Sequence, residues 1–212
     1  MSKTRFIKIP NYLLKESILS SSELYTLSIL LTYQSMEDKT SFPSLETLVK
    51  DWGGTISYHD NIVHQLQDKG IIKITKKKYP NSQNLHNVYH FNFDNSKDFT
   101  KIDLPILQMV KNNKEFGKKG YFYYSKIVRY ANYSTKIWKN KPISTLSKIF
   151  GCCEVTVRRN LKRLEKLGLI KTTYTNKKMI VTIKLQTPSK SVLNPSSPPT
   201  NRKTNKRKVI II

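Results

Sequence analysis

The strongest constraint on the fold of this chain is an internal duplication. Shifting the sequence by 98 positions aligns Leu48, Trp52 and Gly53 with Leu146, Phe150 and Gly151 without a gap. The same shift aligns Val63, Leu66, Gly70, Ile72 and Lys73 with Leu161, Leu164, Gly168, Ile170 and Lys171. Upstream, "FIKIP" at residues 6–10 is echoed by "FTKIDLP" at residues 99–105. One long-period repeat predicts two copies of a single folded unit rather than a solenoid of short repeats.

The first copy predicts three helices followed by a hairpin. Ser20 and Glu23 form a capping box at the start of an apolar helix, and Ser44 starts a short helix that runs to Trp52. After a glycine turn, a helix over residues 56–69 ends before Gly70. Alternating segments on either side of "PNSQN" predict the two strands of the hairpin.

The second copy repeats this order, with helices predicted over residues 121–133, 144–150 and 154–167 and a hairpin that turns near Asn176. Helix, helix, tight turn, helix and two-stranded wing is the order of a winged helix-turn-helix. We therefore expect an α+β fold, mainly α, with two tandem winged helix-turn-helix domains over residues 1–95 and 96–186. Residues 187–212 are rich in Pro, Ser, Asn and Lys and hold no acid, so they are expected to form a disordered basic C-terminal tail.

The charge of the chain is extreme and uneven. The net charge is +24. Residues 1–98 hold 12 Lys/Arg against 10 Asp/Glu, whereas residues 99–212 hold 26 against 4. Such an excess indicates a polyanionic partner, first nucleic acid and second an anionic membrane surface, and most of the contact is expected from the second half.

Composition also limits which cellular compartment and which cofactors are expected for this chain. No apolar run approaches the roughly 20 residues that span a bilayer, and the N-terminus lacks the apolar core of a signal peptide. Cys152 and Cys153 are adjacent, which provides neither a disulfide framework nor a zinc-ligand spacing. A cytoplasmic protein associated with the nucleoid or a plasmid is expected, with no metal, no cofactor and no membrane partner.

The helix predicted over residues 154–167 carries the clearest functional signal. Val157, Leu161 and Leu164 share one face with Gly168 and must point into the core. The outward residues are predicted DNA contacts: Thr156, Arg158, Arg159, Lys162, Arg163 and Lys166. Arg158 and Arg159 lie one turn in, where a guanidinium can pair with guanine in the major groove. The wing residues Lys177 and Lys178 are expected to contact phosphates.

The segment "CEVTVRRNLKRLEKLGLI" resembles the recognition helix and the start of the wing in many bacterial winged-helix proteins. The tandem arrangement, "FIKIPNYLL" and "FPSLETLVKDWG" are similar to replication initiators of Gram-positive plasmids and related phage or island proteins. The resemblance covers roughly residues 5–185. It implies binding at a replication origin and recruitment of host replisome proteins.

The first copy departs from this pattern, because His59, Asp60 and Asn61 stand where the second copy has Val157, Arg158 and Arg159. Two roles are open for it. It contacts DNA through Ser57, Tyr58, Asn61 and the wing residues Lys76, Lys77 and Lys78, or it serves as a surface for a second copy of the chain or another partner.

A catalytic function is not expected. His86, Tyr89 and His90 invite comparison with nicking enzymes, which need two histidines flanking one residue on a strand and a tyrosine on a helix. Here the histidines are too far apart, and Tyr89 shares their strand. The sequence thus predicts a non-enzymatic, sequence-specific binder of double-stranded DNA, of the replication-initiator type. The alternatives are a transcriptional repressor, a partition or transfer-origin protein, and a protein that coats RNA or membrane through charge alone.

Overall fold

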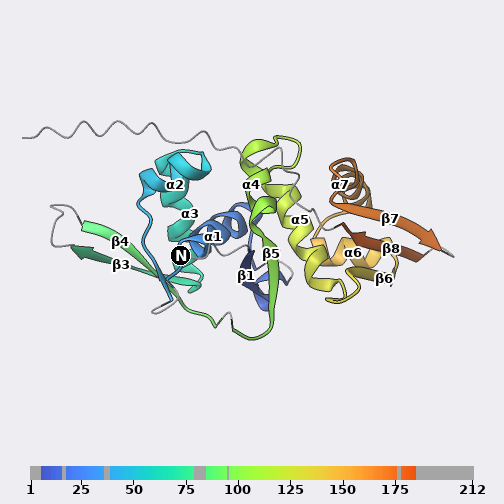
Figure 1. The fold of residues 1–212 in the computed structure, drawn as a ribbon, viewed down its shortest axis with the longest axis horizontal. Coiled ribbons are helices and arrows are strands. Elements are labelled where there is room, and N and C mark those ends of the chain that lie inside the picture. The colour runs from blue at the N-terminus through green and yellow to red at the C-terminus, as the bar shows by residue number, and fades with distance from the viewer. Residues whose placement is uncertain are drawn as a thin grey trace, which may run out of the picture.

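The computed structural model describes residues 6–15, 18–35, 39–78, 85–94, 96–175 and 178–184. Within these ranges the chain has an α+β fold with seven α-helices, one short 3-10 helix and three small antiparallel sheets (Figure 1). The predicted tail at residues 187–212 and the predicted contact Lys177 lie outside the described residues.

The first half begins with a strand and ends with a hairpin. Its elements are β1 (Phe6–Pro10), η1 (Asn11–Leu14), α1 (Ser21–Thr32), β2 (Thr40–Ser41), α2 (Leu45–Trp52), α3 (Ile56–Asp68), β3 (Ile72–Lys78) and β4 (Leu85–Phe91). The sheet has the order β2-β4-β3, and β3 pairs with β4 from Ile72 opposite Phe91 to Lys78 opposite Leu85.

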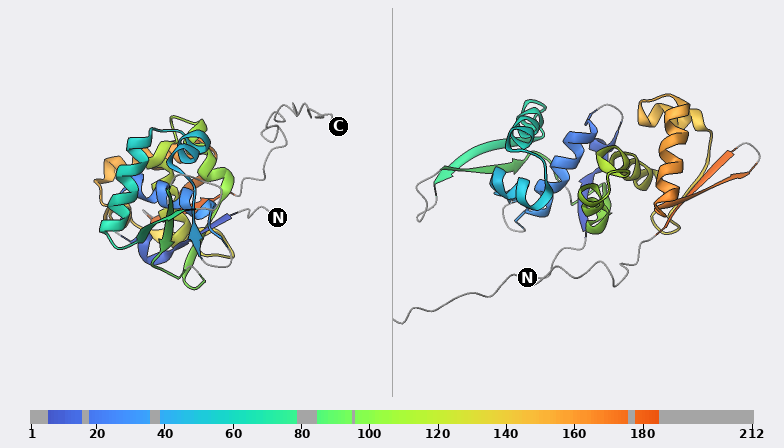
Figure 2. Two further views of the ribbon diagram at one scale, coloured as in Figure 1. Left: turned by 90° about the vertical axis from the view of Figure 1, so that its left-hand side faces the viewer. Right: turned by 90° about the horizontal axis from the view of Figure 1, so that it is seen from above.

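The second half repeats this arrangement, with the α-helix α4 in the place of the 3-10 helix η1. Its elements are β5 (Phe99–Asp103), α4 (Leu104–Asn112), α5 (Gly117–Tyr130), β6 (Ile137–Lys141), α6 (Ile143–Phe150), α7 (Glu154–Lys166), β7 (Ile170–Thr175) and β8 (Lys178–Ile183). The order β6-β8-β7 of its sheet matches the order β2-β4-β3. The two hairpins project at opposite ends of an elongated molecule (Figures 1 and 2).

Local sequence signals set several of the helix ends. The predicted capping box is confirmed: the Ser20 hydroxyl accepts the Glu23 amide at 3.2 Å, and the Glu23 carboxylate accepts the Ser20 amide at 2.7 Å. Ser44 caps α2 by accepting the Thr47 amide. In the turn between α6 and α7, Gly151 has φ 64°, a left-handed conformation that favours glycine.

The two halves are joined by nearly symmetric contacts. β1 pairs with β5, and the register sets Lys8 opposite Lys101. These lysines hold the same place in "FIKIP" and "FTKID", so a pseudo-twofold axis passes between them. Helix α1 packs against α5, where the Tyr121 hydroxyl donates to Ser28 Oγ at 2.8 Å in the interior. A single hydrophobic cluster runs through both halves.

The helix predicted over residues 121–133 has different ends in the structure, where α5 runs from Gly117 to Tyr130. Two glycines in its first turns concealed the start. Gly120 is required there because a Cβ would lie 2.7 Å from a ring carbon of Phe116, which is buried. After Tyr130, Ala131 is extended, and the chain turns into β6. The short helix α4 and the pairing of β1 with β5 were not predicted.

Candidate nucleic-acid interface

Helix α7 is held on the protein by the apolar face that the sequence predicts. Val157, Leu161 and Leu164 are buried, and Asn160 joins them with its side-chain amide donating to the Thr156 carbonyl at 2.9 Å. On the other side, Arg158, Arg159, Lys162 and Lys166 are exposed, whereas Thr156 and Arg163 are half-buried. The outward basic face predicted for this helix is therefore present, and its exposed members are Arg158, Arg159, Lys162 and Lys166.

The carboxylates near α7 leave this basic face largely uncompensated. Glu165 points to the wing: its Oε1 accepts the Thr172 hydroxyl at 2.6 Å and the Thr172 amide. Glu154 lies 3.8 Å from the Arg158 guanidinium, and both side chains are about half exposed. An exposed pair of this kind contributes at most about 1 kcal/mol, so an incoming phosphate or base can displace it.

The end of α7 is paired differently from its start. The Lys166 ammonium lies 3.0 Å from the Glu115 carboxylate, which belongs to the loop before α5. This predicted contact is thus engaged within the protein, again by an exposed pair that is weak in water.

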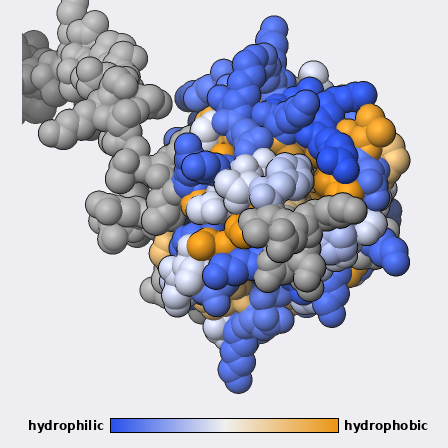
Figure 3. Space-filling view, turned by 90° about the vertical axis from the view of Figure 1, so that its right-hand side faces the viewer, coloured by the Kyte–Doolittle hydropathy of each residue, from blue (hydrophilic) through white to orange (hydrophobic). Residues whose placement is uncertain are grey.

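The wing next to α7 adds groups that the sequence prediction omitted. Lys171 and Tyr174 on β7 are exposed, and Lys171 lies opposite Thr182. The duplication contained the signal for Lys171, since it aligns with the exposed wing residue Lys73. Lys178 begins β8, but its side chain lies outside the described structure. Figure 3 views this end of the molecule and shows hydrophilic side chains over most of the visible face.

Helix α3 holds the matching position in the first half, but its outer face is nearly neutral. Ser57 and Asn61 are exposed, as are Lys76, Lys77 and Lys78 on β3. Asn61 accepts a hydrogen bond from Gln65 at 3.3 Å. Asp60 stands 3.6 Å from His64. Asp60 therefore stands on α3 at the position that corresponds to Arg158 on α7.

Tyr58 is placed differently from the other predicted contacts of α3. The Lys118 ammonium of α5 lies 3.6 Å from the centre of the Tyr58 ring, and the Tyr58 hydroxyl oxygen is buried. This side chain contacts the other half of the protein, so in this arrangement its hydroxyl does not face an outer DNA surface. Sequence could not show this, because Lys118 lies in another helix.

His59 takes the core position that Val157 has in the second half. It is fully buried, and its Nε2 lies 2.8 Å from the Gly53 carbonyl, which identifies Nε2 as the protonated nitrogen. Burial lowers the pKa of His59, and the nearby Lys118 charge acts in the same direction. The imidazole is therefore neutral at ordinary pH and belongs to the core of the first half.

Cys153 marks the start of α7. The thiol is exposed and lies 3.3 Å from the Thr156 hydroxyl. Hydrogen bonds from the hydroxyl and amide of Thr156 lower the pKa of Cys153. Thr55 holds the matching place in the first half, where its hydroxyl caps α3. The exposed Cys153 is thus the N-cap residue of α7, the position that Thr55 has at the start of α3.

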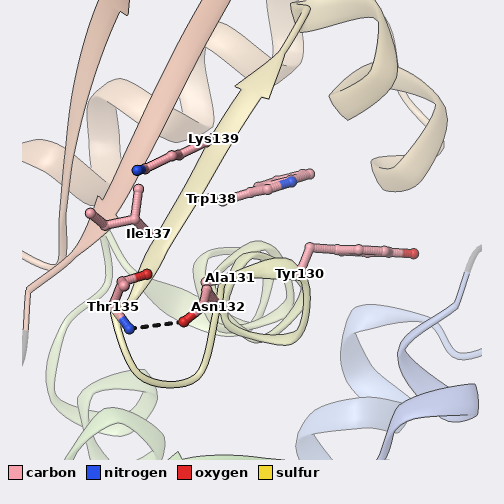
Figure 4. A pocket seen from close by; sticks show the side chains of 7 residues that line it. All are labelled: Tyr130, Ala131, Asn132, Thr135, Ile137, Trp138 and Lys139. Carbon is pink, nitrogen blue, oxygen red and sulfur yellow. Dashed lines mark hydrogen bonds between the residues drawn. The ribbon is translucent and has the colours of Figure 1, made fainter.

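A hollow on the surface of the second half lies away from α7. It is a shallow cavity of about 470 Å³ between the end of α5 and β6, lined by Tyr130, Ala131, Asn132, Thr135, Ile137, Trp138 and Lys139 (Figure 4). The rings of Tyr130 and Trp138 stack at 5.4 Å. Among the described residues, no group of three or more His, Cys, Asp or Glu side chains could hold a metal ion.

The histidine cluster considered for nicking chemistry is part of the β3–β4 hairpin. Tyr89 is fully buried in β4, and burial raises the pKa of its hydroxyl. His90 Nε2 is 2.8 Å from the Thr75 hydroxyl on the neighbouring strand. Tyr89 thus belongs to the core, and His90 connects the two strands of the hairpin.

Comparisons with known proteins return no relative: no protein-family model matches the chain, and no curated protein matches it significantly. In the described part of the chain, every helix is too short or too polar to cross a membrane.

Proposed function

We propose that this chain is a sequence-specific double-stranded DNA-binding protein made of two tandem winged helix-turn-helix domains, at residues 1–95 and 96–186. The order helix, short strand, helix, tight turn, helix and hairpin in both halves supports this proposal, as does the common strand order of the two sheets. In such domains the last helix enters the major groove and the hairpin contacts the backbone.

The observation that carries the proposal is the outer face of α7. Arg158, Arg159 and Lys162 are exposed together, while Glu165 is turned into the wing by Thr172. A helix that is merely solvated would usually keep acids between its basic residues. Arginines near the start of such a helix suit paired hydrogen bonds to guanine, and the wing lysines suit phosphates.

Replication initiation is the role that fits best. The two halves are unlike in charge, +2 for residues 1–98 and +22 for residues 99–212, which favours a division of labour. The second half reads the origin, and the first half, with Asp60 on its matching helix, offers a surface to host replisome proteins or to a second copy of the chain. The resemblance to plasmid and phage initiators supports the same role.

The test begins with DNA recovered from the native host by crosslinking to the protein. Bound segments are cloned into a plasmid that lacks an origin, together with the wild-type gene, an Arg158→Ala/Arg159→Ala gene or a control Lys15→Ala/Lys50→Ala gene. We expect replication with the wild-type and control genes and none with the arginine variant.

The outcome also separates the alternatives. Silencing of a nearby promoter without plasmid replication would replace the initiator by a repressor. Recovery of DNA without any shared sequence would overturn site-specific binding altogether.

A further inference from the structure

The ribbon formed by β1 and β5 has a second face that the proposed function does not use. Along both strands, Ile7, Ile9, Thr100 and Ile102 are buried in the core, and the alternate residues lie on the outer side. Phe6, Lys8, Phe99 and Lys101 form this outer side, and Tyr133 and Lys136 from the loop after α5 adjoin it. These six residues are named the ribbon face.

Aromatic rings and lysines contact one another across the ribbon face in a symmetric pattern. The Lys8 ammonium lies 4.6 Å from the centre of the Phe99 ring, and the Lys101 ammonium lies 4.8 Å from that of Phe6. Each lysine therefore covers the phenylalanine of the other half. The Tyr133 ring has Lys136 at 4.2 Å and Lys101 at 5.7 Å.

The charge on this face is unbalanced. Lys8 and Lys101 lie directly opposite each other, and like charges in that position destabilise a sheet. Among the described residues, no carboxylate forms an ion pair with Lys8, Lys101 or Lys136. Asp103 shares the face but stands opposite Phe6, at the end of the ribbon. An anionic ligand would relieve the repulsion that the fold retains here.

We propose that the ribbon face binds single-stranded DNA, with its lysines on phosphates and its aromatic rings against bases. Lysines alone would suit any polyanion, but the interleaved rings favour unpaired bases, because only a single strand presents its base faces for stacking. Tyr133 is the best placed for this, with 69% of its surface exposed. The cavity of Figure 4 continues the surface through Asn132, Thr135 and the exposed Lys139.

The location of the face separates this activity from duplex binding. The ribbon lies in the middle of the molecule, whereas the wings project at its two ends (Figure 1). A strand held there is thus bound by other side chains than a duplex on α7. The proposal does not depend on sequence-specific duplex binding, although a protein that opens an origin would use both.

The test measures binding of the full chain to a fluorescein-labelled oligothymidylate of about 15 nucleotides, within the site sizes of single-strand binders. The variants are Lys8→Met/Lys101→Met, which retains the aliphatic stems over the rings, and Tyr133→Ala. Each lost phosphate contact lowers the slope of log affinity against log salt by about 0.7 on single strands. We expect a slope smaller by about 1.4 for the double variant, and an affinity at least about fivefold lower for Tyr133→Ala.

Two controls make the result specific. Lys15→Met/Lys50→Met removes the same charge from exposed lysines elsewhere in the first half and should retain oligothymidylate binding. Arg158→Ala/Arg159→Ala should lose duplex binding and retain oligothymidylate binding. Thermal melting followed by circular dichroism reports folding, and Tyr133→Ala covers the case in which the lysine variant unfolds, because Tyr133 is not in the core.

Equal losses for the ribbon and control variants would overturn the proposal in favour of unspecific charge. Undiminished binding in both ribbon variants would also overturn it, and would leave the face as a structural clasp or a surface for an acidic protein. Loss of oligothymidylate binding in the ribbon variants alone supports it, whatever the fate of duplex binding.

Discussion

The hydrogen bond between Tyr121 and Ser28 joins the two halves, and its contribution to stability can be predicted from its geometry. Tyr121 donates to Ser28 Oγ at 2.8 Å, and Ser28 in turn donates to the Leu24 carbonyl at 2.7 Å. Burial raises the pKa of Tyr121, so its hydroxyl stays protonated and acts as a donor. The edge-on contact of its ring with Tyr25 does not involve the hydroxyl.

The two single variants should therefore differ. In Tyr121→Phe the Ser28 hydroxyl keeps its bond to Leu24, so only one hydrogen bond is lost, at about 1 kcal/mol of unfolding free energy. In Ser28→Ala the buried Tyr121 hydroxyl loses its acceptor, which costs about 1–3 kcal/mol. Adding Tyr121→Phe to Ser28→Ala removes the orphaned hydroxyl and should restore part of the stability.

Urea unfolding followed by far-UV circular dichroism and tyrosine fluorescence measures all three variants. Both probes should report one transition, because β1 pairs with β5 and one hydrophobic cluster spans both halves. The reasoning would be refuted if Ser28→Ala proved less destabilising than Tyr121→Phe, or if the halves unfolded in two separate steps.

Three further predictions concern α7, its wing and the first half. Maleimide should label Cys153 faster than the half-buried Cys152, because the pKa of Cys153 is lowered. Bound duplex should slow the labelling of Cys153, which mass spectrometry can follow. If duplex does not slow the labelling, DNA binds elsewhere on the protein. Glu165→Gln should weaken the charged hydrogen bonds to Thr172 and lower the unfolding free energy by about 1 kcal/mol, whereas an unchanged melt would show that the wing does not depend on them. Glu23 is buried, which opposes its charge, but hydrogen bonds from Lys69 and Ser20 outweigh burial and hold its pKa below the ordinary 4.5. Its contribution is thus present above pH 4.5 and lost as the pH falls further, so Glu23→Gln should flatten the decline of unfolding free energy in acid, and an equally steep decline would assign it to other carboxylates.

The features that sequence predicted correctly are those fixed within one or two helical turns. The capping box at Ser20, the cap at Ser44 and the glycine turn at Gly151 depend on neighbours only a few residues away. The buried face of α7 follows from periodicity alone. The duplication strengthened such predictions, because matching residues occur in both halves.

What sequence could not predict is decided by contacts between distant residues. β1 and β5 are too short to identify as strands, and their pairing joins residues 6–10 to residues 99–103. Tyr58 looks outward on a helical wheel but turns to Lys118, and Glu165 looks like a solvated acid but is bound by Thr172. In each case the partner lies in another element, and only the fold brings it near.

The most direct test of the central proposal compares base preferences of the wild-type protein, Arg158→Ala and Lys171→Ala on a panel of duplexes with every single substitution in a selected site. A lost base contact should relax preference at one position by roughly 5- to 150-fold, or about 1–3 kcal/mol, whereas loss of a wing phosphate contact at Lys171 should weaken all duplexes alike. We expect Arg158→Ala to show the first pattern and Lys171→Ala the second. An unchanged preference profile for Arg158→Ala would contradict the assignment of α7 as the recognition helix.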